Sequence, residues 1–215
     1  MTELTTTCDD IPTLPTAIQV SHLSHYFGHR KAVDDLNLCV QAGSCFGLLG
    51  PNGAGKTTTI RLINTLLPVQ EGTIRVFGHD VARDPFAVRR RIGYVPQQLS
   101  IEPALTGREN VTWFARLYDI PRRQRRARVD QALEMVSLTG EADRLASTYS
   151  GGMVRRLELA QALVNQPSVL ILDEPAVGLD PVARDSVWER VRDMQRRNAM
   201  TILLTTHYME EAEAL

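Results

Sequence analysis

The segment GPNGAGKTT, from Gly50 to Thr58, has the residue types and spacing of a loop that wraps around phosphate groups. Its glycines let the backbone approach an anion, and the helix that starts near Lys56 directs its first N–H groups toward the same point. A glycine-rich turn that only starts a helix is the alternative, and the strand and helix patterns on either side argue against it. We expect Lys56 on the β- and γ-phosphates, the Thr57 hydroxyl on Mg²⁺ and Thr58 on a further phosphate contact. The sequence therefore predicts a nucleoside triphosphate site, whose loop consists of Gly50, Pro51, Asn52, Gly53, Ala54, Gly55, Lys56, Thr57 and Thr58.

Two consecutive carboxylates end the apolar run VLILDE at residues 169–174. Ligands of open α/β sheets collect at the carboxyl ends of the strands, where Asp173 is expected to lie. Asp173 is therefore the expected partner of Mg²⁺, directly or through water. Glu174 points the other way off the strand end, which suits a group that accepts a proton from an attacking water. A solvated strand end is the weaker alternative for this pair, given the phosphate loop earlier in the chain.

The elements that must position these groups follow from the periodicity of the apolar residues. Strands are predicted at residues 17–27, 33–40, 44–50, 72–78, 169–173 and 201–207, and helices at residues 56–67, 108–120, 122–138, 151–165 and 181–198. A β-rich start, a helical middle and a β/α end indicate a parallel α/β core with an inserted helical subdomain. Residues 1–16 are polar and show no periodicity, so we expect a flexible N-terminal tail.

The composition is that of an ordinary globular domain, with 215 residues, 43% hydrophobic residues and a net charge of −1. So small a net charge disfavours broad electrostatic binding to nucleic acid or anionic lipid as the main activity. No apolar stretch approaches the roughly 20 residues that cross a bilayer, and the N-terminus has no signal-peptide pattern. We expect any role at a membrane to depend on a partner.

A second anion site is predicted at YSGGM, residues 149–153, which leads directly into a helical pattern. Ser150 is expected to cap this helix, and Gly151 and Gly152 let a phosphate approach its first turn. Together with GPNGAGKTT, YVPQ, VLILDEP, GLD and TTH, in chain order, this segment resembles the nucleotide-binding subunit of an ABC transporter over about residues 18–215. It looks most like the single-domain ATPases of ABC-2-type exporters, which serve drug, polysaccharide and antibiotic-resistance systems.

The resemblance implies a P-loop NTPase (RecA-like) fold, with a mixed-sheet core at residues 17–97 and 166–215 and a helical subdomain at about 98–165. It implies an ATPase whose two subunits, expected to be a homodimer, pair head to tail and enclose two ATP molecules. Ser150 and Gly152 would then contact ATP in trans. Transmembrane permease subunits are the implied partners, so we expect the chain at the cytoplasmic face of the inner (plasma) membrane, with no nucleic acid bound.

The resemblance also implies roles for residues outside these loops. Gln97 matches the glutamine that reaches Mg²⁺ and the water, His207 the histidine that hydrogen-bonds the γ-phosphate, and Asp180 the aspartate at the dimer seam. Phe27 matches the aromatic residue that stacks on adenine, with Tyr26 as the alternative. The implied catalytic set is Glu174, His207 and Gln97, and the implied Mg²⁺ ligands are Thr57, Gln97 and Asp173.

The chain departs from the family pattern in two places. Tyr149 and Met153 replace the commoner Leu and Gln, so a side-chain hydrogen bond from position 153 is lost. The family continues after EEAEAL with further strands and a helix, so we expect either a truncated chain or a core that is incomplete at its C-terminal edge. The basic run at residues 122–128 is predicted as a solvated helical face, with a binding patch for a partner, nucleic acid or lipid as the alternative. Trp113 and Phe114 are predicted as core residues of the helical subdomain, and the resemblance gives the alternative that they lie near the groove that couples to the membrane subunit.

Three other functions compete with the transporter interpretation. A non-transport ABC ATPase of DNA repair or translation usually has a long coiled-coil insertion or two fused ATPase domains, for which this chain has no room. A P-loop kinase or GTPase is disfavoured by the SGG signature and by the lack of an NKxD motif. A structural module gated by nucleotide without catalysis is disfavoured by Glu174.

Overall fold

The structure, a computed structural model, describes residues 15–206, apart from the side chains of residues 197 and 198. Thr16, which the sequence assigned to the tail, already lies in the first strand. The elements of the described range are, in order, β1 (Thr16–Phe27), β2 (Arg30–Gln41), β3 (Cys45–Leu49), α1 (Lys56–Ile63), β4 (Glu71–Val76), β5 (His79–Asp80), α2 (Pro85–Arg91), β6 (Ile92–Val95), α3 (Gly107–Leu117), α4 (Arg122–Met135), the short 3₁₀ helices η2 (Thr139–Glu141) and η3 (Ala146–Thr148), α5 (Gly151–Leu163), β7 (Val169–Asp173), α6 (Pro181–Asn198) and β8 (Thr201–Thr206).

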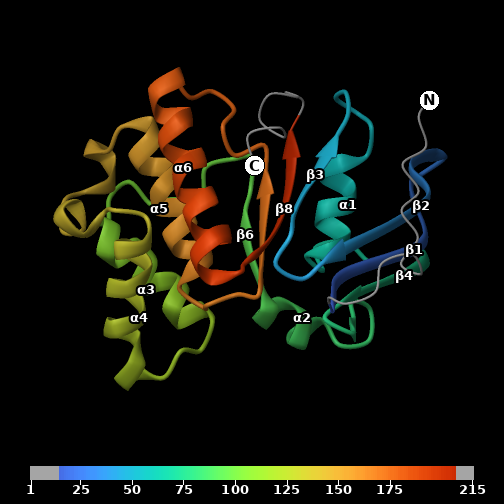
Figure 1. Ribbon diagram of the computed structural model, residues 1–215, viewed down its shortest axis with the longest axis horizontal. Coiled ribbons are helices and arrows are strands. Elements are labelled where there is room, and N and C mark those ends of the chain that lie inside the picture. The colour runs from blue at the N-terminus through green and yellow to red at the C-terminus, as the bar shows by residue number, and fades with distance from the viewer. Residues whose placement is uncertain (1–14, 207–215) are drawn as a thin grey trace.

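A parallel sheet with the strand order β3-β8-β7-β6 forms the centre of the molecule (Figure 1). Leu49 of β3 pairs with Thr206 of β8, and Thr205 pairs with Asp173 of β7, so these strands end at one edge. Helices α3 to α6 lie on one side of the sheet, and α1 and the second sheet lie on the other (Figure 1). Polar side chains that follow these strands therefore meet at the same edge.

Strand β7 shows why the run VLILD is continuously apolar. Leu170 and Leu172 belong to the hydrophobic core shared with the helical part of the chain. Val169 and Ile171 belong to the core shared with β1, β2, β4 and α1. A parallel strand covered on both faces needs apolar side chains at every position, which is the pattern of this segment.

A second, antiparallel sheet has the strand order β2-β1-β4-β5. Its first two strands form a hairpin in which Phe27 pairs with Arg30, beside the phosphate loop. Short turns join antiparallel neighbours, which accounts for the β1–β2 and β4–β5 pairs of this sheet. The parallel and antiparallel strands of the expected mixed core thus occupy two four-stranded sheets.

The part of the chain between β6 and β7 is helical, as its periodicity predicted. Helix α3 begins with a capping box, in which Thr106 accepts from the Glu109 N–H and Glu109 accepts from the Thr106 N–H. The basic run at residues 122–128 opens α4, where most of its side chains are exposed, as expected of a solvated face. Phe114 packs against the core, whereas Trp113 is 54% exposed. The prediction of core packing was therefore wrong for Trp113, which lies on the outer face of α3.

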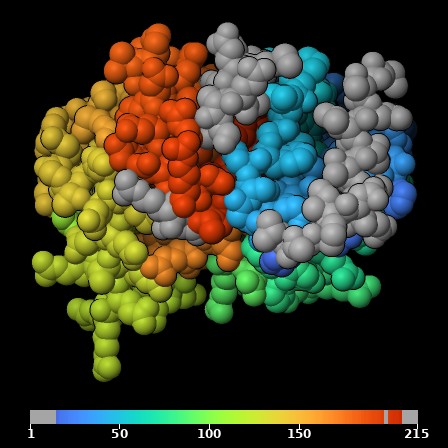
Figure 2. All heavy atoms as spheres, viewed as in Figure 1, coloured from blue at the N-terminus to red at the C-terminus, as the bar shows by residue number. Residues whose placement is uncertain are grey.

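The outer side of α6, orange to red in Figure 2, lies between the helical part in yellow and the segment around β3 in blue. Asp180 caps the start of α6, where its carboxylate accepts a hydrogen bond from the Ala183 N–H at 3.0 Å. The side chains of Val187, Trp188 and Val191 are buried on the inner side of this helix. Helix α6 thus begins after the carboxyl end of β7 and packs against α5 of the helical part.

Candidate active site

A cavity of about 510 Å³ lies at the carboxyl edge of the parallel sheet. Residues from the β1–β2 hairpin, the phosphate loop, α1 and the segments after β6 and β7 line it. They are Phe27, Arg30, Ala32, Asn52, Gly53, Gly55, Lys56, Thr57, Thr58, Gln97 and Glu174. Parts of the chain more than 100 residues apart thus meet here, as the sequence predicted for Lys56 and Glu174.

The phosphate loop lies between β3 and α1. Gly55 has a φ of 89°, and a Cβ there would lie 2.4 Å from the Ala32 carbonyl oxygen, so only glycine fits. Gly55 also occupies the N-cap of α1 without a side-chain cap, which leaves N–H groups of the first turn available to an anion. The Lys56 ammonium donates to the carbonyl oxygens of Gly50 at 2.5 Å and Pro51 at 3.0 Å. The loop therefore offers an anion both free backbone N–H groups and the positive charge of Lys56.

Asp173 and Thr57 form a pair of oxygen ligands beside the loop. The Thr57 hydroxyl donates to Asp173 Oδ1 at 3.3 Å, and the Thr205 hydroxyl donates to the same oxygen at 2.6 Å. Among residues 15–206 no group of three or more His, Cys, Asp or Glu side chains could hold a metal ion. This donor set fits Mg²⁺, which proteins commonly bind through one or two carboxylates and the phosphates of a substrate.

Glu174 faces the cavity with an unusual backbone. Its side chain accepts a hydrogen bond from Gln97 Nε2 at 3.0 Å, and the residue is only 8% exposed. Its φ is 50°, in the left-handed region, which is costly for a residue with a Cβ. The Glu174 N–H donates to the hydroxyl of Thr205 at 3.0 Å and to its carbonyl at 3.2 Å, and these bonds hold the strained turn. The sheet thereby directs the carboxylate of Glu174 toward Gln97.

Three features of the site were missed from the sequence. Strand β6, which delivers Gln97, has four residues, too few for a visible period. Thr205 contacts both acids, and its position two residues before His207 was the available signal. Arg30 lines the cavity three residues after Phe27. On β6, burial and the nearby Asp173 carboxylate raise the pKa of Tyr94 to about 12.

The residues expected to act in trans lie away from this cavity. Ser150 caps α5 and accepts from the Met153 N–H at 3.3 Å, so Met153 contributes through its backbone. A Cβ on Gly152 would lie 3.0 Å from the Cβ of Ala183, the residue whose N–H donates to the Asp180 carboxylate at the start of α6. Ser150, Gly151, Gly152 and Asp180 do not line the cavity. His207 lies outside the described residues.

Phe27 and Tyr26 differ clearly in their positions. Phe27 is 50% exposed and lines the cavity, with its ring edge-to-face against His25 at 4.9 Å between centroids. The ring of Tyr26 lies 5.5 Å below the Lys31 ammonium and does not line the cavity. Of the two, Phe27 offers an aromatic face to a planar ligand.

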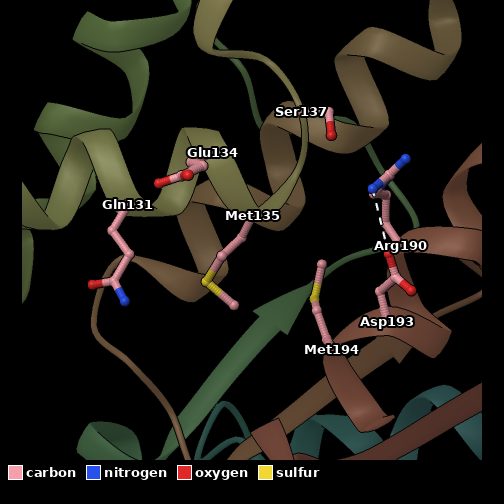
Figure 3. Close-up of a pocket in the computed structure, with 7 residues that line it drawn as sticks. All are labelled: Gln131, Glu134, Met135, Ser137, Arg190, Asp193 and Met194. Carbon is pink, nitrogen blue, oxygen red and sulfur yellow. Dashed lines mark hydrogen bonds and ion pairs between the residues drawn. The ribbon is translucent and has the colours of Figure 1, made fainter. Parts of the chain in front are cut away.

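A second cavity, of about 440 Å³, lies between α4 and α6. Figure 3 shows Met135 from α4 and Met194 from α6 on opposite sides of it. Arg190 pairs with Asp193 at 3.4 Å, and Glu134 adds a further carboxylate. One arginine and two carboxylates line this second cavity, and no residue of the phosphate loop takes part, so the first cavity is the candidate active site.

Comparisons with known proteins find matches over most of the chain. A family model described as ABC transporter matches residues 33–177. The chain is 49% identical to the Nod factor export ATP-binding protein I of Paraburkholderia xenovorans, over 93% of this chain and 65% of that protein. It is 47% identical to the daunorubicin resistance ATP-binding protein DrrA3 of Streptomyces coeruleorubidus, over 93% and 63%. The chain thus spans slightly less than two thirds of these curated relatives.

Two solved structures have the same fold. One is the dimeric structure of a post-hydrolysis state of the ATP-binding cassette MJ0796 bound to ADP and Pi, with a TM-score of 0.79 and 25% identity over 92% of this chain and 90% of that chain. The other is cbiO1 from Clostridium perfringens, part of the ABC transporter complex cbiONQ, with a TM-score of 0.81 and 28% identity over 91% and 80%.

Proposed function

The chain belongs to the ABC transporter family, and from this premise we propose that it binds and hydrolyses ATP to drive export through separate transmembrane subunits. The observation that carries the proposal is the cavity at the carboxyl edge of the parallel sheet. It brings Lys56, Thr57, Gln97 and Glu174 around one space of about 510 Å³, with an exposed aromatic ring at its rim.

ATP binding is proposed to use the loop and the ring together. The Lys56 ammonium would exchange its two carbonyl contacts for β- and γ-phosphate oxygens, which are stronger acceptors for a charged donor. The loop from Gly50 to Thr58 would surround the phosphates, while Phe27 stacks on adenine. Bound Mg²⁺ supplies charge that neutralises the phosphate oxygens, and Thr57, Asp173 and Gln97 are the residues proposed to hold it.

Hydrolysis is proposed to rely on Glu174 as general base. Its carboxylate would accept a proton from a water molecule as the water oxygen attacks the γ-phosphorus and the bond from that phosphorus to ADP breaks. Gln97 lies within hydrogen-bond distance of Glu174, so it is suited to orient both the carboxylate and the water. His207 is proposed to hydrogen-bond the γ-phosphate.

A head-to-tail dimer is proposed because residues that the family resemblance implies in nucleotide binding lie outside the cavity. Ser150, Gly151, Gly152 and Asp180 form a second set of helix-start groups that does not line the cavity. In a head-to-tail pair, the start of α5 would complete the nucleotide site of the partner subunit. The solved cassette with the same fold is itself a dimer.

The partner at the membrane is proposed to be a permease of the ABC-2 exporter type. No helix among the described residues is long and apolar enough to cross a bilayer. Leu99, Trp113 and Leu117 expose large apolar side chains on the loop after β6 and on α3. We propose that this surface contacts the permease and that the chain acts at the cytoplasmic face of the inner membrane.

The test compares Glu174→Gln and Lys56→Ala with Glu134→Gln, a control for the same charge change in the second cavity. Glu174→Gln is expected to lower the ATPase rate about 100-fold or more and to accumulate an ATP-bound dimer on size exclusion. Lys56→Ala is expected to lose ATP affinity in calorimetry, and Glu134→Gln to behave as wild type. ATP hydrolysis by Glu174→Gln at the control rate would refute the general-base role.

A further inference from the structure

A buried ion pair on α5 holds the loop that carries Gln97. Arg155 and Glu158 are 3% and 1% exposed, and Arg155 Nη1 donates to Glu158 Oε2 at 2.8 Å. The two residues lie three positions apart on α5, so they share one face of the helix. That face contacts the loop from Pro96 to Ser100.

The pair binds three backbone groups of this loop. Arg155 donates to the carbonyl oxygens of Pro96 at 2.8 Å and Gln97 at 3.2 Å. Glu158 Oε1 accepts from the Ser100 N–H at 2.6 Å and from its hydroxyl at 3.1 Å. Residues 96–100 form neither helix nor strand, so these side chains replace the backbone partners that regular structure would supply.

The cost of burying the pair argues for a role beyond stability. Burial raises the pKa of Glu158 even though Arg155 and Ser100 act in the opposite direction, so the charged form is disfavoured where it lies. Replacing a buried ion pair by apolar side chains of similar volume is often neutral or stabilising. An apolar pair would nevertheless leave the carbonyl groups of Pro96 and Gln97 without these donors.

From this geometry we infer that Arg155 and Glu158 are positioning residues that couple the two ATP sites of the proposed dimer. Both lie on the helix that Ser150 caps, and α5 packs against β6, which leads into the Gln97 loop. In the proposed dimer, Ser150 contacts the ATP of the partner subunit while Gln97 contacts Glu174 in its own site. A shift of α5 on engaging the second ATP therefore moves Gln97 relative to Glu174.

The coupling rests on the proposed function, whereas the loop contacts can be measured without it. In the nucleotide-free wild-type chain, the Ser100 amide is expected to exchange hydrogen about 10-fold more slowly than the amide of exposed Leu99. In the double variant Arg155→Met/Glu158→Leu, which leaves no unpaired buried charge, this protection is expected to disappear. Arg108→Met is the control, because Arg108 pairs with Asp130 and Asp143, away from the loop.

The same variants test the coupling in ATPase assays. The double variant is expected to keep its affinity for a single ATP within about 2-fold, while kcat falls about 10-fold and the Hill coefficient falls toward 1. Arg108→Met is expected to keep both parameters. A double variant with wild-type kcat and Hill coefficient would overturn the coupling, and equal exchange at Ser100 and Leu99 in the wild type would overturn the loop contacts.

Two further outcomes are a double variant that does not fold and a wild-type chain that does not hydrolyse ATP. If the double variant does not fold, Ser100→Ala takes its place, because Ser100 is exposed and the change removes only the hydroxyl bond to Glu158. Its amide is then expected to exchange about 3-fold faster, with a matching partial loss of cooperativity, and wild-type values would overturn the inference. A wild-type chain without ATPase activity would refute the proposed function and the coupling, while the exchange data still decide the loop contacts.

Discussion

Replacing Thr205 by valine should separate the stability of the sheet from the chemistry at its edge. Thr205 is fully buried, and its hydroxyl donates to Asp173 and accepts from the Glu174 N–H. Valine fills nearly the same volume without the hydroxyl. The substitution removes both hydrogen bonds, leaving the Asp173 carboxylate with the longer Thr57 contact and the Glu174 N–H with its 3.2 Å bond to the backbone carbonyl of residue 205.

The magnitude follows from these two bonds. Losing a buried hydrogen bond to a charged group costs about 1.5–3 kcal/mol, so we expect Thr205→Val to lower the free energy of unfolding by about 2–3 kcal/mol. In a chain of this size, such a change lowers Tm by about 4–12 °C. Without the bridging hydroxyl, the strained turn at Glu174 is less constrained. We expect kcat to fall about 10-fold or more, because small misplacements of catalytic groups are costly.

Thr201→Val is the matched control at the other end of the same strand. Thr201 is also buried, and its hydroxyl accepts from the Gly43 N–H at 2.9 Å, far from the two acids. We expect this variant to lose about 1 kcal/mol of stability and to keep its kcat. Thermal melting measures the loss of stability in both variants, and steady-state ATPase assays measure their kcat. If Thr205→Val hydrolyses ATP as fast as Thr201→Val, the hydroxyl does not orient the catalytic groups.

Two further predictions concern side chains away from the acids. A Cβ on Gly107 would lie 2.3 Å from the hydroxyl of Tyr149, which donates to the Glu141 carbonyl, so Gly107→Ala is expected to cost about 1–2 kcal/mol. In a Tyr149→Leu background the cost should vanish, as a double-mutant cycle by chemical denaturation would show; additive effects would contradict the clash. Burial raises the pKa of Cys45 to about 11, so its thiolate fraction near pH 8 is about 100-fold below that of an ordinary cysteine. Peptide mass spectrometry should find slow alkylation by iodoacetamide in the folded chain and rapid alkylation in denaturant, and equal rates would disprove the shift.

The sequence was most informative where neighbouring residues act together. The nine residues from Gly50 to Thr58 form one contiguous loop, so their spacing alone indicated an anion site. The continuous apolar run VLIL indicated a strand buried on both faces, because a parallel strand covered on both sides has no polar face. The positions of Asp173, the last residue of that strand, and of Glu174, the next residue, could be predicted from where the apolar run ends. These features depend on local chain geometry, which a linear pattern encodes.

Periodicity and spacing did not show which side chains from distant parts of the chain pair, and only the family resemblance placed Gln97 in one catalytic set with Glu174. Gln97 and Glu174 are 77 residues apart, and Ser100 and Glu158 are 58 apart. Glu158 lies in a helical pattern where a glutamate normally indicates a solvated position, yet it is buried against a loop. The separation of the strands into two sheets also depended on which strands pair, and single-strand periodicity does not contain that information.

The left-handed backbone of Glu174 sets a limit on engineering the chain. A residue with a Cβ at φ 50° costs about 1–3 kcal/mol, and glycine would remove most of that cost. Any selection for thermal stability alone would therefore favour glycine at position 174, and it would discard the proposed general base as it did so. A thermostable version of this domain should be sought with position 174 fixed, and with stabilising changes confined to surfaces such as the outer side of α6.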